Sequence, residues 1–158
     1  MNTVERAREI LVGLITRFEG LHRVGKDGLI YAYLCPAGYP TQGYGLRVDN
    51  LRVDPITKDE ALKRLHAALP RYMSHAARIV PGCVSSPERL AALSDFAFNL
   101  GPTALQSSTM ARRANDGDWE RAASECMRWV YAGGVELDGL VRRRGAEARL
   151  LLTEPSPA

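Results

Sequence analysis

Glu19 is the residue whose position first suggests chemistry. Apolar residues recur at helical spacing before it, at Val4, Ala7, Leu11, Leu14 and Phe18. This spacing predicts a helix over residues 3–19. Glu19 would then lie in the last turn at the edge of the apolar face, where burial and the helix dipole both favour a protonated carboxyl. Such a group suits general-acid cleavage of a glycosidic bond. The alternative is a solvated glutamate before the capping residue Gly20.

The helical period is lost from residue 21 to about residue 55. Glycines alternate there with tyrosines, a pattern typical of short strands joined by tight turns. The segment therefore predicts a small sheet of two or three strands.

Capping signals predict the remaining helices. Asn2 with Glu5 and Thr57 with Glu60 form capping boxes, and the second begins a long helix that Pro70 should kink or divide. Shorter helices are expected after the caps Ser86 and Asp118, around residues 104–106, over residues 108–115, and over residues 139–152.

The composition is that of one globular domain. The chain has 158 residues, of which 46% are hydrophobic and 25% charged. The net charge of +3 is mild and dispersed, which weakly favours an anionic partner such as cell wall or nucleic acid and identifies neither. Only the run Arg142-Arg143-Arg144 would support a nucleic-acid partner, so we expect none. No signal peptide or membrane anchor is recognised at the N-terminus. The three cysteines and three histidines are scattered, so we expect reduced thiols and neither a metal nor a cofactor.

Several motifs, in order along nearly the whole chain, resemble the phage-type lysozymes of glycoside hydrolase family 24. They are Phe18-Glu19-Gly20-Leu21, Ala32-Tyr33-Leu34-Cys35-Pro36-Ala37-Gly38, Thr41-Gln42-Gly43-Tyr44-Gly45, Phe96-Ala97-Phe98-Asn99-Leu100-Gly101 and Gly139-Leu140-Val141-Arg142-Arg143-Arg144. The resemblance implies a single α+β, lysozyme-like domain over residues 1–158. Its β-rich lobe would span about 21–55, and its larger helical lobe about 70–152 plus the N-terminal helix. A long helix would join the lobes, with the active site in the cleft between them.

The resemblance also implies the catalytic residues. The family pattern is a Glu, eight residues, an Asp or Cys, five residues and a Thr, which gives Glu19 as acid with Cys35 and Thr41 holding or activating a water. Fifteen residues rather than eight separate Glu19 from Cys35, so about seven are inserted around residues 25–30. Asp27 is a rival for the role of Cys35; its alternative is a turn residue. Leu46 also departs from the His-Thr that the family usually shows after Gly45.

Three further residues are candidates through the resemblance. Residue matching favours Arg142 as the arginine that braces the glutamate, whereas periodicity places Arg144 on the buried side. Asn99 and Tyr44 are candidate sugar contacts, with helix end and hairpin packing as their respective alternatives.

The implied activity is hydrolysis of the β-1,4 bond between N-acetylmuramic acid and N-acetylglucosamine in peptidoglycan. Inversion and retention both remain open, because a thiol is a weaker base than a carboxylate but a better nucleophile. Alternatives are a lytic transglycosylase or chitosanase, and a wall-binding module without activity. We expect a monomer made in the host cytoplasm that reaches periplasmic peptidoglycan after a holin permeabilises the membrane.

Overall fold

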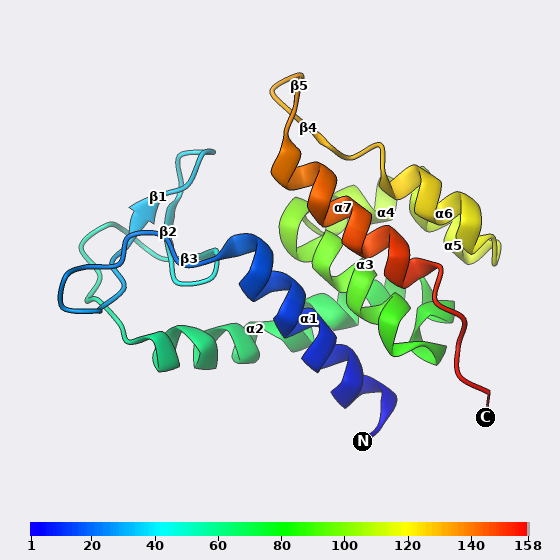
Figure 1. The fold of residues 1–158 in the computed structure, drawn as a ribbon, viewed down its shortest axis with the longest axis horizontal. Coiled ribbons are helices and arrows are strands. Elements are labelled where there is room, and N and C mark those ends of the chain that lie inside the picture. Colours follow the sequence, from blue (N-terminus) through cyan, green and yellow to red (C-terminus); the bar gives the residue numbers. More distant parts are fainter. Residues whose placement is uncertain (158) are drawn as a thin grey trace. The chain divides into compact units, whose positions relative to one another are not determined.

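The computed structural model describes residues 1–157, which form two compact units, residues 1–14 with 69–157 and residues 15–68. The first unit is mainly helical, and the second holds a small antiparallel sheet (Figure 1). Two helices run from one unit into the other: α1 (Thr3–Glu19) and α2 (Lys58–Ile79). The expected mixture of helices with a small sheet is confirmed.

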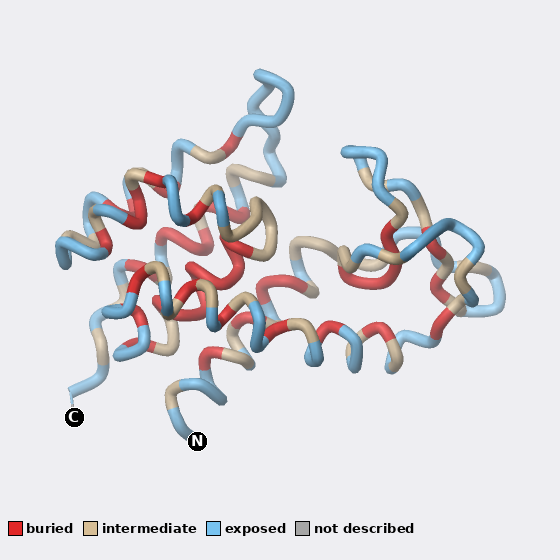
Figure 2. The backbone as a smooth tube through the Cα atoms, turned by 180° about the vertical axis from the view of Figure 1, so that it is seen from behind, coloured by how far each residue is buried: buried red, intermediate tan, exposed pale blue. Residues whose placement is uncertain are grey.

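The first unit is built around α3 (Pro87–Leu100), which is buried along most of its length (Figure 2). It packs against the 3₁₀-helix η1 (Pro81–Ser85), α4 (Pro102–Ser107) and α7 (Asp138–Leu151). Helices α5 (Thr109–Asn115) and α6 (Trp119–Cys126) pack together, and α6 also contacts α7. A small hairpin of β4 (Tyr131–Ala132) and β5 (Val135–Glu136) precedes α7.

The predicted caps are confirmed. Ser86 and Asp118 each accept a hydrogen bond from the backbone N–H three residues on. Ser108, expected as the first residue of a helix, is instead the cap of α5 and accepts from Ala111 N–H. Asn2 and Glu5 exchange both bonds of a capping box, at 2.9 Å each. These caps satisfy N–H groups that the first helical turn leaves unpaired, so local sequence suffices to predict where these helices begin.

Elsewhere the structure differs in detail from the sequence prediction. Helix α2 continues through Pro70, so the division into two helices is wrong. Neither η1 nor the β4–β5 hairpin was expected. Both are very short, and so short a strand pair has too few residues to show a period of two.

The second unit holds a three-stranded antiparallel sheet of β1 (Tyr33–Leu34), β2 (Pro40–Gln42) and β3 (Leu46–Arg47), in that order. Thr41 of the central strand is paired with Tyr33 on one side and with Arg47 on the other. Residues opposite each other in a ladder project from the same face, so these three side chains form one row across the sheet.

Gln42 ties this sheet to its surroundings. It is 2% exposed, and its Nε2 donates to the carbonyls of Ile30 and Asp54 at 3.0 Å each. Its Oε1 accepts from Arg64 of α2 at 3.2 Å. One buried amide therefore joins the sheet to two loops and a helix.

The inserted segment forms a hairpin over residues 23–31, which we call the inserted hairpin. Tyr31 N–H donates to the Arg23 carbonyl at 2.9 Å, and Gly25 N–H to that of Leu29 at 2.8 Å. At its base Ile30 is 1% exposed and exchanges two backbone hydrogen bonds with Ile56. The extra residues thus extend the antiparallel pairing of the second unit instead of forming an irregular loop.

Candidate active site

Glu19 is the last residue of α1, and its carboxylate lies against the backbone of Gly45. A Cβ added to Gly45 would stand 2.9 Å from Glu19 Oε2, a distance that real Cβ atoms do not show. Gly45 also has a φ of +80°, a conformation that favours glycine. The turn after β2 therefore gives the carboxylate room that only a glycine leaves. Gly20 has a φ of +63°, which confirms the glycine cap after Glu19.

Cys35 begins the turn that joins β1 to β2. Cys35 N–H donates to the Tyr39 carbonyl at 3.0 Å, and Gly38, with a φ of +84°, closes the turn. The Tyr39 N–H lowers the pKa of the Cys35 thiol most, and the Ala37 and Gly38 N–H groups lower it further. A cluster of N–H groups of this kind stabilises an anion, so the turn favours the thiolate.

Thr41 places its hydroxyl next to Cys35. The side chain is 3% exposed, and Oγ1 donates to the Tyr39 carbonyl at 2.9 Å. A hydrogen bond from the same hydroxyl also lowers the pKa of the Cys35 thiol. Since a hydroxyl has one proton, Thr41 can donate to the Tyr39 carbonyl or to the Cys35 thiolate, but to only one of them at a time. Its oxygen can still accept a hydrogen bond from a water.

Tyr33 is a site residue that sequence reasoning missed. Burial, then the charges of Glu19 and Cys35, raise the pKa of its phenol. Its ring packs on His22, with centroids 4.9 Å apart. One neutral phenol therefore lies within electrostatic reach of both candidate catalytic groups. Its position two residues before Cys35, on the same face of an extended strand, could have revealed it.

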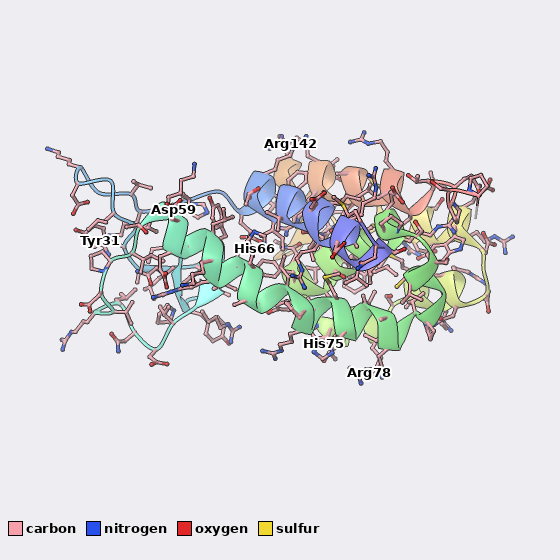
Figure 3. The ribbon with its side chains drawn as sticks, turned by 90° about the horizontal axis from the view of Figure 1, so that it is seen from below. Tyr31, Asp59, His66, His75, Arg78 and Arg142 are labelled. Atoms are coloured by element: carbon pink, nitrogen blue, oxygen red, sulfur yellow. The ribbon has the colours of Figure 1, made fainter. Side chains whose placement is uncertain are left out.

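Asp27 has a structural role in the inserted hairpin. Its Oδ1 accepts from Leu29 N–H at 3.0 Å and its Oδ2 from the Tyr31 hydroxyl at 2.6 Å. The Tyr31 hydroxyl and the Leu29 N–H lower the pKa of the Asp27 carboxyl. Both oxygens are thus held by the hairpin itself, which favours the turn role over the rival catalytic one. Tyr31 is labelled in Figure 3.

Arg142 and Arg144, the two candidates for the arginine that braces the glutamate, differ in burial. Arg142, labelled in Figure 3, is exposed, and among the described residues no hydrogen bond or ion pair to it is found. Arg144 is fully buried, as periodicity predicted. The neighbouring Arg143 is also buried, and it donates to both Asp95 oxygens at 2.8 and 2.9 Å. Burial thus gives no support to Arg142 as the brace.

Arg143 and Arg144 belong to a buried polar cluster of the first unit, with Asp95, Glu147 and Cys126. Arg144 Nη2 donates to Glu147 Oε1 at 2.8 Å, and Arg144 Nε lies 2.7 Å from Glu147 Oε2. Burial, then the charge of Asp95 and a hydrogen bond to it, raise the pKa of Glu147 well above its usual range. Cys126 Sγ lies 3.4 Å from Glu147 Oε2, and burial raises the pKa of that thiol.

The two candidate sugar contacts have different environments. Asn99 is partly buried, and its Oδ1 accepts from Arg144 Nη2 at 2.9 Å. Tyr44 is 5% exposed, which favours the packing role over a sugar contact.

His66 and His75, labelled in Figure 3, are separated along α2. Within residues 1–157 no three His, Cys, Asp or Glu side chains are grouped to hold a metal ion. No helix in this part of the chain is long and apolar enough to cross a membrane.

Comparison with known proteins identifies the family. Residues 17–147 match the phage lysozyme family. The endolysin of Acyrthosiphon pisum secondary endosymbiont phage 1 is 33% identical over 145 residues, which cover 87% of this chain and 91% of that protein. The endolysin of Bacillus phage B103 is 32% identical over 146 residues. That match covers 92% of this chain but only 53% of the Bacillus phage protein.

Solved structures are similar over almost the whole chain. The muramidase domain of SpmX from Asticcacaulis excentricus has a TM-score of 0.78 at 29% identity, covering 92% of this chain and 96% of that one. An endolysin from Escherichia coli O157:H7 phage FAHEc1 has a TM-score of 0.73 at 28% identity, and the match covers 100% of this chain and 98% of that one. With its fold and its sequence in agreement, this chain belongs to the phage lysozyme family.

Proposed function

We propose that this protein is a muramidase of the endolysin type, which hydrolyses the β-1,4 bond between N-acetylmuramic acid and N-acetylglucosamine in peptidoglycan. Family membership and the similarity to a muramidase domain support this function. The observation that carries it is the contact of the Glu19 carboxylate with Gly45, in the turn after β2, the strand that contains Thr41.

In the proposed mechanism Glu19 is the general acid. It protonates the leaving oxygen while the glycosyl carbon gains oxocarbenium character. The Thr41 hydroxyl holds a water, and the Cys35 thiolate accepts a proton from it as it attacks. The lowered pKa of Cys35 supports this role, because it increases the thiolate fraction at neutral pH.

The thiolate also gives a second candidate route. As a nucleophile, Cys35 would form a covalent glycosyl-enzyme intermediate, which water then hydrolyses with retention. The anomeric form of the first product, followed by NMR, distinguishes the routes. Inversion supports attack by water held at Thr41, and net retention would overturn that assignment.

The central experiment compares Glu19→Gln with the wild type on purified peptidoglycan. We expect the release of reducing ends to fall by about 10² to 10⁴-fold, because the proton donor is lost. An unchanged circular-dichroism spectrum is the control for folding. Equal activity of both proteins would refute the role of Glu19, and inactivity of both would favour a wall-binding module.

The product mass separates hydrolysis from transglycosylation. A hydrolase adds one water to each cleaved bond, whereas a lytic transglycosylase forms an anhydro-sugar and adds none.

The variants Cys35→Ser and Asp27→Asn, assayed for the release of reducing ends, identify the second catalytic residue. We expect only the Cys35 variant to lose most of its activity, because the Asp27 oxygens are already bonded within the inserted hairpin.

The setting of the reaction follows from the proposed activity. We propose that the protein acts as a monomer on periplasmic peptidoglycan, after synthesis in the host cytoplasm and permeabilisation of the membrane by a holin. Lysis by the protein expressed in the cytoplasm, with and without a co-expressed holin, tests this dependence. Lysis without the holin would contradict it.

A further inference from the structure

The row of side chains across the sheet continues past the proposed catalytic residues. Thr41 is paired with Arg47 of β3, so Arg47 projects from the face that carries Thr41 and Tyr33. The backbone bond between Cys35 N–H and the Tyr39 carbonyl continues the β1–β2 pairing. Tyr39, two residues before Thr41, therefore lies diagonally opposite Arg47.

Arg47 and Tyr39 form a stacked pair. The guanidinium carbon of Arg47 lies 3.7 Å from the centroid of the Tyr39 ring. Both side chains are exposed, Tyr39 by 46%. A guanidinium held flat on a ring loses less rotational freedom when it binds a ligand, since the ring already restricts it.

The N–H groups of Arg47 remain available for a ligand. Over residues 1–157 no carboxylate forms an ion pair with Arg47, and no hydrogen bond from its side chain is found. Its neighbour Arg64 differs in both respects, as it pairs with Glu60 at 3.2 Å and donates to Gln42. Stacking leaves the guanidinium edge open, and that edge suits a carboxylate in bidentate geometry.

We infer that the Arg47–Tyr39 pair is a binding site for a carboxylate of the peptide stem of peptidoglycan. This inference rests on the proposed function. The stem branches from N-acetylmuramic acid, the same sugar whose C1 would be attacked at Cys35 and Thr41. A cation directly across the strand from Thr41 is therefore placed to bind an acidic group on that branch. The pair would make the enzyme selective for glycan strands that carry anionic stems.

The test uses soluble peptidoglycan fragments in two forms, with carboxylates intact or converted to amides by carbodiimide and ammonia. For Arg47→Gln we expect KM on the intact form to rise about tenfold, the loss typical of one charge-assisted contact, with kcat unchanged. On the amidated form we expect Arg47→Gln and the wild type to have equal KM values. Arg52→Gln is the matched control, because Arg52 is an exposed arginine of the same unit outside this row.

Tyr39→Leu tests the stacking itself. It removes the ring and keeps the backbone groups around Cys35, so we expect a smaller rise in KM, again only on the intact form. The double variant should be no worse than Arg47→Gln alone, because both changes affect one contact.

Two results would overturn the inference. The first is an equal rise in KM for Arg47→Gln on both substrate forms, which would indicate a structural role. The second is an unchanged KM on both forms. Failure of the proposed function is recognised separately, since the wild type would then release no reducing ends from either form.

Discussion

The close contact between Glu19 and Gly45 gives the most direct test of the site at the residue scale. In Gly45→Ala the new methyl would lie 2.9 Å from Glu19 Oε2, at a φ of +80°. We expect activity to fall at least tenfold, because the carboxylate must move, with a loss of stability of about 1 kcal/mol from backbone strain. Hydrolysis rates and urea unfolding measure the two effects.

The matched control is Gly28→Ala in the inserted hairpin. Gly28 has a φ of +78° and open space around its Cα, so it should suffer the strain without the contact to Glu19. If both variants lose activity equally, the contact with Glu19 does not matter for catalysis.

The three cysteines should differ sharply in reactivity. We expect iodoacetamide to modify Cys35 first, with a rate that is half-maximal at a pH below that of a free cysteine, because N–H groups lower the pKa of its thiol. Burial raises the pKa of Cys83 to about 12 and that of Cys126 well above its usual range. Peptide mass spectrometry over a pH series measures each rate.

Thr41→Val is the companion variant for this experiment. It should shift the Cys35 profile to higher pH, because it removes one donor to the thiolate. Labelling of Cys83 or Cys126 as fast as Cys35 in the folded protein would contradict the assignment.

At the scale of elements, Gln42 positions the sheet strand that carries Thr41. Its amide holds the carbonyls of Ile30 and Asp54 and accepts from Arg64. In Gln42→Met these groups lose their partner while the volume stays similar, so we expect a destabilisation of about 2 kcal/mol or more and reduced activity. Urea unfolding measures the loss of stability. The control is Gln106→Met, because Gln106 lies at an exposed helical position. A change as small as that of the control would contradict this role.

The inserted hairpin shows how a sheet element accommodates extra residues. Ile30 pairs with Ile56, and Asp27 with Tyr31 closes the tip. A Cβ at Gly25 would stand 2.6 Å from Asp27 Oδ1 and 2.7 Å from the Tyr31 ring, so a larger residue there would have to displace these side chains. The segment between Glu19 and Cys35 therefore forms a hairpin of its own, and β1 pairs with β2 beyond it.

At the scale of the whole molecule, the buried cluster around Glu147 should make stability depend on pH. The raised pKa of Glu147 means that the folded protein keeps its proton at pH values where the unfolded chain, with a glutamate pKa of about 4.3, has lost it. The stabilisation is complete below about pH 4.3 and decreases as the pH rises toward the pKa of the folded state. The slope is up to about 1.4 kcal/mol per pH unit.

Glu147→Gln isolates this effect, because glutamine has a similar shape and no proton to lose. We expect the free energy of unfolding of the wild type, relative to that of the variant, to fall between pH 5 and pH 7 in urea titrations. Glu9→Gln, at an exposed glutamate of α1, should show no such change. Parallel pH profiles for the wild type and Glu147→Gln would contradict the raised pKa.

The sequence by itself determined the features that depend on neighbouring residues. The apolar period before Glu19 and the caps at Asn2, Ser86 and Asp118 are confirmed, because a cap satisfies N–H groups within one turn of itself. The family motifs likewise predicted the membership that the comparisons show.

Only the tertiary structure decided the features that join distant parts of the chain. The Glu19 carboxylate meets Gly45 across 26 positions, the difference between their residue numbers, and Arg143 pairs with Asp95, 48 positions away. Spacing along the chain favoured neither Arg143 as a buried partner nor Tyr33 as a site residue. Which side chains come together depends on how helices and strands pack, and a local pattern contains the period of one element but not the identity of its neighbour.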